Sequence, residues 1–260
     1  LFKTPAGNLC GKGVITMEKI GIIGGSGLTS LRALEIHRRE VVHTPYGEPS
    51  GPYSIGLFDN IEVIFQPRHG AGHTIPPHAV NYQANIWGLR ELGVSKIIGM
   101  AAVGGITTDM CPGTICVPDQ IIDYTYSRKH TFFDDDQTPV THIDFTEPYC
   151  QELRQALLTA GQSCDIDIKD KATYGATQGP RLETSAEIRR MEKDGCDIVG
   201  MTGMPEAALA SELGLCYACC AVIVNWAAGK SDGPIKMEEI DQNLATGMAD
   251  ARRILAALSI

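Results

Sequence analysis

The sequence predicts one α/β domain in which helices flank a β-sheet. Short apolar runs rich in β-branched residues alternate with longer helical segments along the 260-residue chain, as is typical of a wound α/β domain. The 28 glycines and 14 prolines suit the many tight turns of such a fold. No repeat, low-complexity tract or long linker divides the chain. We therefore expect one domain over residues 17–260 and an extension outside the fold over residues 1–16.

The predicted strands are short apolar runs bounded by glycine, proline or polar residues. The last of them contains the apolar run Val222 to Val224 and stops at Asn225. Because a buried amide needs a hydrogen-bond partner, Asn225 is expected to meet a ligand or another polar group. In chain order the predicted strands cover residues 19–23, 41–43, 53–58, 61–67, 96–102, 114–117, 172–176, 198–200 and 216–224.

Helices are predicted where longer segments carry a helical pattern of apolar residues. The third one opens with TSAEIRRMEK, in which Thr184 or Ser185 can cap the first turn and Glu187 adds negative charge there. The acidic run 134–136 is interpreted as a solvated loop. The predicted helices cover residues 77–92, 151–160, 185–193, 204–213 and 238–258.

Composition excludes some classes of partner. A formal net charge of −9 argues against binding to nucleic acid, and no apolar run is long enough for a transmembrane helix. The nine cysteines are scattered, mostly among apolar neighbours, which predicts free buried thiols in a reducing cytoplasm. Cys216 and Cys219 form a CxxC pair, but within an apolar strand rather than an exposed redox loop.

The first predicted strand runs into the glycine-rich stretch GIIGGSGL. Glycines allow successive backbone N–H groups to converge on an anion, so a phosphate loop around Ser26 and a plain tight turn both remain open. The stretch fails the dinucleotide fingerprint, because Ser30 stands where the third glycine belongs. A dehydrogenase is therefore excluded.

Arg68 and His69 follow another predicted strand, in FQPRHGAGHTIPPH. A guanidinium fork matches phosphate geometry in a bidentate way, and an adjacent histidine can add a hydrogen-bond donor. The alternative is a metal site built from His69, His73 and His78. The glycines and the Pro76–Pro77 pair make the required helix improbable there, so no metal is expected.

Four predicted strands end in small or glycine-rich loops that carry a few polar groups. Ligands of open α/β sheets bind at the carboxyl ends of strands, and a crevice for an anion and an uncharged polar ligand is inferred. For any one of these motifs, ordinary packing remains an alternative to ligand binding, and Thr202 and Glu206 could instead cap the helix that follows them. The groups concerned are Ser26, Arg68 with His69, Ala101 with Ala102, and Thr202.

Long motifs in a fixed order resemble those of the trimeric purine nucleoside phosphorylases, and most closely their 5′-methylthioadenosine phosphorylase branch. They are GIIGGSGL, TPYGEPSGP, RHGAGHTIPPHAVNYQANIWGLRELG, QGPRLET, DIVGMTGMPEAALASELGLCYA and the strand that ends at Asn225. The resemblance implies the phosphorylase fold, with a twisted mixed sheet flanked by helices, and a homotrimer. It also implies cleavage of a purine nucleoside by inorganic phosphate, with no metal or organic cofactor.

Site roles follow from the same resemblance. Asn225, Arg68 and His69 would carry the chemistry, and His142 would reach the site of the neighbouring subunit. Three positions depart from relatives: Ala101 replaces a hydroxyl residue, Leu182 an aromatic residue and Gln178 a glutamate. The implied phosphate contacts are Ser26, Arg68, His69, Ala101, Ala102 and Thr202; Met201 would face the ribose, and Leu182, Gln178, Asn225, Trp226 and Ala227 the base.

The substrate is inferred from a further departure. Methylthioadenosine phosphorylases end this strand in Asp-x-Asp, whereas here it reads Asn225-Trp226-Ala227. An amide can donate to O6 of a 6-oxopurine and accept from N7–H, whereas an ionised carboxylate would oppose O6. A hypoxanthine- or guanine-type base is therefore expected.

The 5′ end of the nucleoside is a separate matter. No histidine follows His142, and Met237 and Ile240 lie one helical turn apart, where they can form an apolar wall or simply pack the last helix. With His73 and the neighbour's His142, they would hold a 5′-methylthio group. We expect 5′-methylthioinosine as substrate; inosine or guanosine, then methylthioadenosine, are the alternatives, and a non-catalytic nucleoside-binding protein is a different class.

Overall fold

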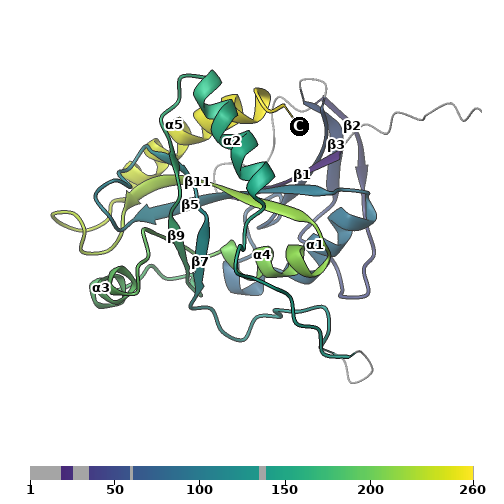
Figure 1. The fold of residues 1–260 in the computed structure, drawn as a ribbon, viewed down its shortest axis with the longest axis horizontal. Helices are drawn as coiled ribbons and strands as arrows, with labels where there is room; N and C mark the ends of the chain where they lie inside the picture. Colours follow the sequence, from purple (N-terminus) through teal and green to yellow (C-terminus); the bar gives the residue numbers. More distant parts are fainter. Residues whose placement is uncertain (1–18, 26–34, 59–60, 135–138, 260) are drawn as a thin grey trace, which may run out of the picture.

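The computed structural model describes residues 19–25, 35–58, 61–134 and 139–259. Within them, eleven strands form one mixed sheet, with helices on both faces (Figure 1). The sheet order is β2-β3-β4-β1-β5-β10-β9-β7, while β11 pairs with β5 and β6, and β6 pairs with β8. The strands are β1 (Lys19–Gly24), β2 (Glu35–Glu40), β3 (Tyr53–Phe58), β4 (Ile61–Pro67), β5 (Lys96–Gly105), β6 (Ile115–Val117), β7 (Gln120–Asp123), β8 (Ile168–Asp170), β9 (Thr173–Ala176), β10 (Ile198–Gly200) and β11 (Cys216–Trp226).

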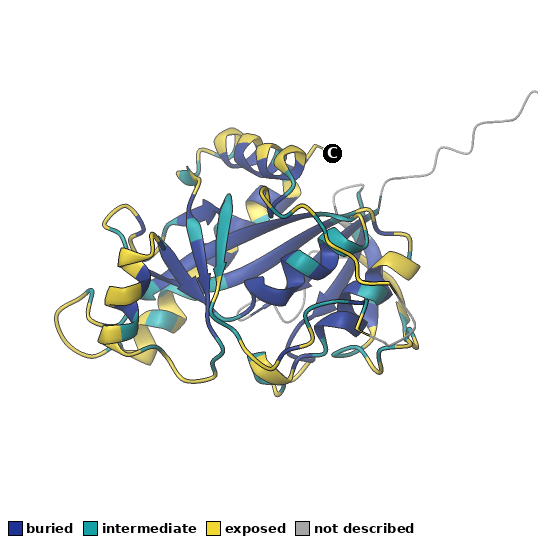
Figure 2. Cartoon of the chain, turned by 60° about the horizontal axis from the view of Figure 1, so that its bottom comes forward, coloured by how far each residue is buried: buried dark blue, intermediate teal, exposed yellow. Residues whose placement is uncertain are grey.

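Two hydrophobic layers cover the sheet. One joins α1 (Tyr82–Glu91) and α4 (Gly203–Glu212) to the sheet, through residues such as Ile86 and Leu209. The other joins α2 (Gln151–Ser163) and α5 (Met237–Ala256), through Leu157 and Ile254. The helix α3 (Ser185–Lys193) packs on a smaller cluster. The buried residues accordingly gather along the sheet and on the inner faces of the helices (Figure 2).

The strand β5 is the centre of the sheet, and one of its edges changes partner. Its first half pairs with β1, from Lys96 to Gly99, and its last residues Gly104 and Gly105 pair with β10. Along its other edge β11 runs parallel over the whole length. Between these two pairings, at residues 100–103, this edge of β5 has no neighbouring strand among the described residues.

The predicted fold class is confirmed, with some corrections to elements. The predicted strand 41–43 is wrong: the strand β2 lies just before it, over Glu35–Glu40. This strand is an exposed edge strand with the sequence EIHRRE, so it has no apolar pattern to predict it. The short strands β7 and β8 were also not predicted. The predicted helix 77–92 is divided into the 3₁₀ turn Pro77–Ala79 and α1, because the Asn81 side chain caps α1 by accepting from the Ala84 N–H.

One cysteine prediction is wrong. Cys150 and Cys216 form a disulfide, because the N-terminus of α2 lies against the first residues of β11, where the Cys150 N–H donates to the Tyr217 carbonyl at 2.8 Å. Sequence spacing could not reveal that proximity. The other described cysteines are free thiols, as predicted, and four of them are buried: Cys116, Cys196, Cys219 and Cys220.

The predicted capping of α3 is confirmed. The Thr184 hydroxyl accepts from the Glu187 N–H, and the Glu187 carboxylate accepts from the Thr184 N–H, which completes a capping box.

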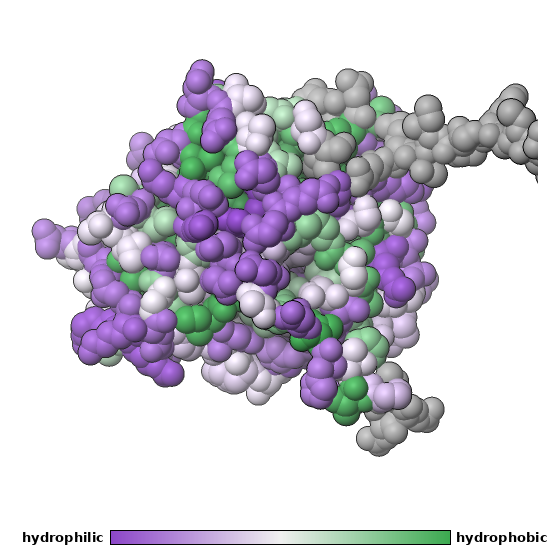
Figure 3. Space-filling model, viewed as in Figure 1, coloured by the Kyte–Doolittle hydropathy of each residue, from purple (hydrophilic) through white to green (hydrophobic). Residues whose placement is uncertain are grey.

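Hydrophilic side chains dominate the face seen in Figure 3, with hydrophobic groups between them. Among the described residues, no helix has the length and apolar character needed to cross a membrane.

Candidate active site

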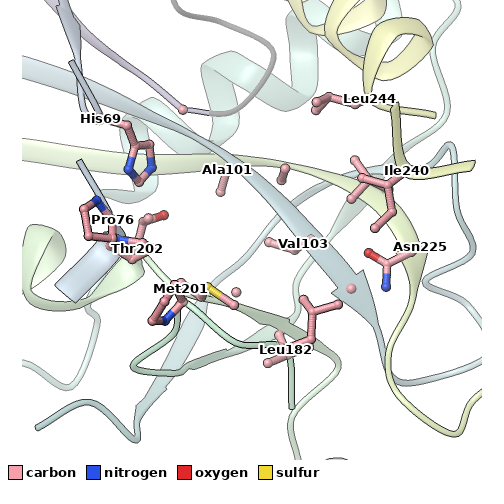
Figure 4. A pocket seen from close by; sticks show the side chains of 18 of the residues that line it. His69, Pro76, Ala101, Val103, Leu182, Met201, Thr202, Asn225, Ile240 and Leu244 are labelled. Atoms are coloured by element: carbon pink, nitrogen blue, oxygen red, sulfur yellow. The ribbon is translucent and has the colours of Figure 1, made fainter. Parts of the chain in front are cut away.

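A cavity of about 530 Å³ opens where β5 loses its neighbour β1. Its floor is Ala101 to Gly104, and its walls come from the ends of β1, β10 and β11, the loop after β4 and the start of α5. His69, Pro76 and Thr202 lie at one end, and Asn225 lies at the other, beside Ile240 (Figure 4). The structure thus confirms that the predicted strand ends meet in one crevice.

The open edge of β5 supplies backbone groups to the cavity. Met100 uses its carbonyl on this edge to accept from Arg68 Nη1 at 2.8 Å. Because strand residues alternate in the direction of their N–H and C=O groups, Ala102 presents its N–H to the same edge. Ala101 and Ala102 both line the cavity. Their small side chains leave this backbone within reach of a ligand.

Arg68 is held from below by a buried carboxylate. Its guanidinium donates to both oxygens of Glu206, with Nη2 at 2.8 Å from Oε2, and the Tyr217 hydroxyl donates to the same oxygen at 2.9 Å. Arg68 and Glu206 are 1% and 0% exposed. Burial alone lowers the pKa of Arg68, but the Glu206 charge more than offsets this and the pKa ends above its ordinary value.

Three of the five N–H groups of Arg68 are therefore used inside the protein, which leaves two for a ligand. Gly25 also lines the cavity, and a Cβ placed there would lie 2.8 Å from Arg68 Nη1 and 2.9 Å from the Met100 oxygen. The glycine is thus needed for the close approach of the first loop to the guanidinium. The predicted phosphate contact Ser26 lies outside the described residues.

His69 lies beside Arg68 at the same end of the cavity. Its Nδ1 is 2.8 Å from the Ile75 carbonyl oxygen. Burial, and then the nearby Arg68 charge, lower the pKa of His69 to about 4. The His73 ring is 4.6 Å from the His69 ring, between centroids, so the structure places His73 next to the predicted phosphate contacts.

The loop between β10 and α4 brings Met201 and Thr202 to the cavity. Thr202 occupies the N-cap position of α4 without a capping hydrogen bond from its side chain, so its hydroxyl is not used as a cap. The buried Arg128 holds this loop, because its Nη1 donates to the carbonyls of Met201 at 2.9 Å and Met204 at 2.6 Å. Sequence reasoning missed Arg128; a lone arginine in a loop carries no motif.

The opposite end of the cavity is set by a bulge in β11. The register with β5 shifts between Ile223 and Asn225, which displaces the end of the strand. The Asn225 amide is at the cavity, and its Nδ2 donates one hydrogen bond to the Trp226 carbonyl at 2.6 Å. One amide N–H and the amide oxygen remain for a ligand. Ala227 lines the cavity, whereas Trp226 is not among its lining residues.

The opposing wall at this end comes from the loop before α3. Leu182 and Glu183 both line the cavity, and Glu183 accepts from the Thr177 hydroxyl at 2.7 Å. Sequence reasoning missed Glu183, although it adjoins Leu182 in QGPRLET. Gln178 is placed differently from the prediction: its amide oxygen accepts from Arg128 Nε at 3.1 Å, and its side chain lines a neighbouring cavity instead.

An apolar wall lies above Asn225. Ile235 just before α5, and Met237, Ile240 and Leu244 in its first two turns, line the cavity. Figure 4 shows Ile240 next to Asn225 and Leu244 farther from it. Met237 is still 60% exposed, so it lies at the rim. His142 is on an exposed loop and is not among the lining residues of its own chain. Within the described part of the chain, no three metal-ligating side chains come together.

Comparison with known proteins agrees with this geometry. The model of the family described as the phosphorylase superfamily matches residues 19–259. A protein of Pseudomonas syringae named probable S-methyl-5′-thioinosine phosphorylase is 53% identical over 240 residues, covering 92% of this chain and 98% of the relative. A Pyrococcus furiosus protein named 6-oxopurine nucleoside phosphorylase is 46% identical over 250 residues, covering 94% and 93%.

Among solved structures, the methylthioadenosine phosphorylase of Schistosoma mansoni in complex with adenine superposes with a TM-score of 0.88. It is 32% identical, and the match covers 92% of this chain and 90% of that one. The likeness in fold thus extends over most of both chains. Sequence and fold together show that the chain belongs to the phosphorylase superfamily and is a nucleoside phosphorylase.

Proposed function

We propose that the protein cleaves 5′-methylthioinosine with inorganic phosphate, giving hypoxanthine and 5-methylthioribose 1-phosphate. The observation that carries this proposal is the pairing of Asn225 with an apolar wall at one end of the cavity. The free amide N–H of Asn225 suits O6 of a 6-oxopurine, and its oxygen suits N7–H. The names of the relatives support the same substrate class.

Glu183 supports the same base. A 6-oxopurine carries an N–H donor at N1, which a carboxylate can accept. Adenine has an acceptor at N1, and a carboxylate facing it would leave both groups unmatched. Each buried mismatch costs about 1–3 kcal/mol, so Asn225 and Glu183 together favour the 6-oxo base over the 6-amino base.

The chemistry needs positioning and charge rather than a protein nucleophile. A phosphate oxygen attacks C1′ while the C1′–N9 bond breaks, and the electron pair of that bond moves to the purine. The sugar passes through a cationic, oxocarbenium-like state, which the adjacent phosphate anion stabilises. Overall the purine gains one proton and the phosphate loses one. Arg68, His69, Thr202 and the Ala102 N–H are the groups available to orient the anion, and no cofactor is required.

The assembly and location are also proposals. We propose a homotrimer in which the exposed His142 loop completes the neighbouring site near the 5′ group. The free thiols among the described residues support a cytoplasmic location, while the Cys150–Cys216 disulfide is the feature that argues against it. Sedimentation of the purified protein would decide the assembly, and a monomer with full activity would reject the role of His142.

Substrate comparison tests the function directly. Initial rates of cleavage should be measured for methylthioinosine, methylthioadenosine, inosine and guanosine, each with and without phosphate. We expect kcat/KM to be highest for methylthioinosine and to vanish without phosphate. Faster cleavage of methylthioadenosine would reject the role of Asn225. Equal cleavage of inosine and methylthioinosine would reject the apolar wall, and in that case the protein is an inosine or guanosine phosphorylase.

A variant of the wall sharpens this comparison. Ile240→Ser should lower kcat/KM for methylthioinosine several-fold relative to inosine, because each buried methylene contributes about 0.8 kcal/mol. Ile36→Ser is the matched control, since Ile36 is 44% exposed on the edge strand β2. The control should leave the ratio of the two substrates unchanged.

A further inference from the structure

The hydrogen bond of His69 determines which of its ring nitrogens carries a proton. Nδ1 is 2.8 Å from the Ile75 carbonyl oxygen, and a carbonyl oxygen can only accept. The proton must therefore be on Nδ1. The contact is fixed by the chain, because the N–H groups of Thr74 and Ile75 both donate back to the His69 carbonyl, at 3.0 and 3.1 Å.

The ring is neutral at neutral pH. Burial, with the charges of Arg68 and His73, lowers the pKa of His69 to about 4, against a smaller opposite effect of the Ile75 carbonyl. A neutral imidazole with its proton on Nδ1 has a bare lone pair on Nε2. Among the described residues, no protein group donates to Nε2, and His69 lines the cavity.

The other groups at this end of the cavity differ from His69. Arg68 has two N–H groups left over and Ala102 has its backbone N–H, and all of these donate. The Thr202 hydroxyl can donate or accept. His69 Nε2 is thus an acceptor whose role is fixed by the Ile75 contact, beside the N–H donors of Arg68 and Ala102.

We propose that His69 Nε2 accepts a hydrogen bond from the P–O–H group of inorganic phosphate, so that the site selects a protonated oxyanion over one without an O–H group. The proposal rests on the function proposed above and specifies the form in which the co-substrate binds. Phosphate keeps at least one O–H group at neutral pH, and arsenate does the same. Sulfate has a similar size and charge but no O–H group.

The lone pair on His69 Nε2 should weaken the binding of an anion that has no O–H group. A sulfate oxygen placed against Nε2 would bring two acceptors together and leave the buried nitrogen without a partner. An unmatched buried group of this kind reduces affinity about ten- to a hundred-fold. Fluorophosphate is the sharpest probe, because it is a dianion of nearly the same shape in which fluorine replaces the O–H group.

The experiment measures binding of four anions to the purified wild-type protein at pH 7.5 by calorimetry, with competition against phosphate in the cleavage assay. Phosphate and arsenate should bind at least ten-fold more tightly than sulfate and fluorophosphate. The calorimetry should be repeated in two buffers with different heats of ionisation. If sulfate bound as tightly as phosphate, or bound with uptake of one proton by His69, the proposal would be overturned.

Two variants connect the selectivity to this nitrogen. His69→Gln places an amide near Nε2 that can donate as well as accept, so the preference for phosphate over sulfate should shrink to within a few-fold. His43→Gln replaces a histidine that is 80% exposed and does not line the cavity, so the wild-type preference should remain. An unchanged preference in folded His69→Gln would also overturn the proposal.

The outcome is separable from that of the proposed function. If methylthioinosine is cleaved by phosphate while sulfate competes equally, the function stands and the role of His69 as an acceptor is wrong. If no nucleoside is cleaved and no anion binds, both are wrong.

Discussion

The Arg68 guanidinium and the Glu206 carboxylate form an ion pair sealed beneath one end of the cavity, with both side chains almost fully buried. The Tyr217 hydroxyl completes the carboxylate's partners. The pair fixes the direction of the guanidinium and leaves two of its N–H groups for the cavity. Removing one partner of a buried ion pair leaves the other charge buried without a partner. This destabilises the folded state far more than replacing both partners with apolar residues.

Glu206→Gln should therefore lower the free energy of unfolding by about 3–5 kcal/mol, because Arg68 keeps its charge and loses its counter-ion. Urea unfolding, followed by circular dichroism, measures the change. Glu239→Gln is the matched control, since Glu239 is paired with Lys236 on the surface at 2.9 Å, and it should leave stability unchanged. Equal effects of the two substitutions would show that the buried pair is not a structural requirement.

Arg128→Lys should impair the loop that carries Met201 and Thr202. The Arg128 guanidinium also donates to the carbonyls of Thr177 and Gln178, at 3.1 and 2.9 Å, and an ammonium group cannot reproduce this planar set of contacts. We expect a loss of about 1–3 kcal/mol in stability and at least a ten-fold fall in kcat/KM.

The control for Arg128 is Arg190→Lys, because the Arg190 side chain is 74% exposed. It should retain wild-type stability and kinetics. A normal KM for phosphate and a normal kcat in folded Arg128→Lys would show that this loop does not depend on Arg128.

Asn225→Asp with Ala227→Asp should move the preference toward 6-amino bases. The measured quantity is the ratio of kcat/KM for methylthioadenosine to that for methylthioinosine, which a general loss of stability does not alter. We expect a rise of at least ten-fold, since a matched polar contact is exchanged for a mismatched one. Gln178→Glu should leave the ratio unchanged, because Gln178 faces Arg128 rather than the base end of the cavity. No shift in the double variant would place selectivity elsewhere.

Stability should fall between pH 6.5 and pH 4 because of His69. The folded-state pKa is about 4, below the ordinary value of 6.5, so the unfolded chain binds a proton in this window that the folded protein does not. The stabilising effect is complete above pH 6.5 and is lost as the pH falls. Relative to His69→Gln, the wild-type protein should lose about 1–2 kcal/mol between pH 7 and pH 5.

The control for this titration is His43→Gln, because the His43 side chain is 80% exposed. Unfolding at a series of pH values should give the same pH dependence for this variant and the wild-type protein. The same dependence in His69→Gln would assign the effect to other groups.

Strong local patterns predicted much of the fold. The apolar runs of β1, β4, β5 and β11 are long enough to identify buried strands, and the capping box of α3 is visible in TSAEIRRMEK. The exposed edge strand β2 was missed because its stability comes from pairing with β3, and its residues carry no pattern of burial. The disulfide between Cys150 and Cys216 was missed for a similar reason, since it depends on where α2 meets β11.

Some features of the site could likewise be predicted from the sequence, and others could not. The fold class, the convergence of polar groups at strand ends and the amide at Asn225 could be predicted from the sequence, because each depends on residue type at a recognisable local position. Four features of the site are visible only in the folded chain: Glu206 pairs with Arg68, Gln178 accepts from Arg128, Glu183 lines the cavity, and the Ile75 carbonyl fixes the His69 proton. Those facts depend on contacts between segments far apart in the chain or on the direction of a side chain, and neither has a local signal in the sequence.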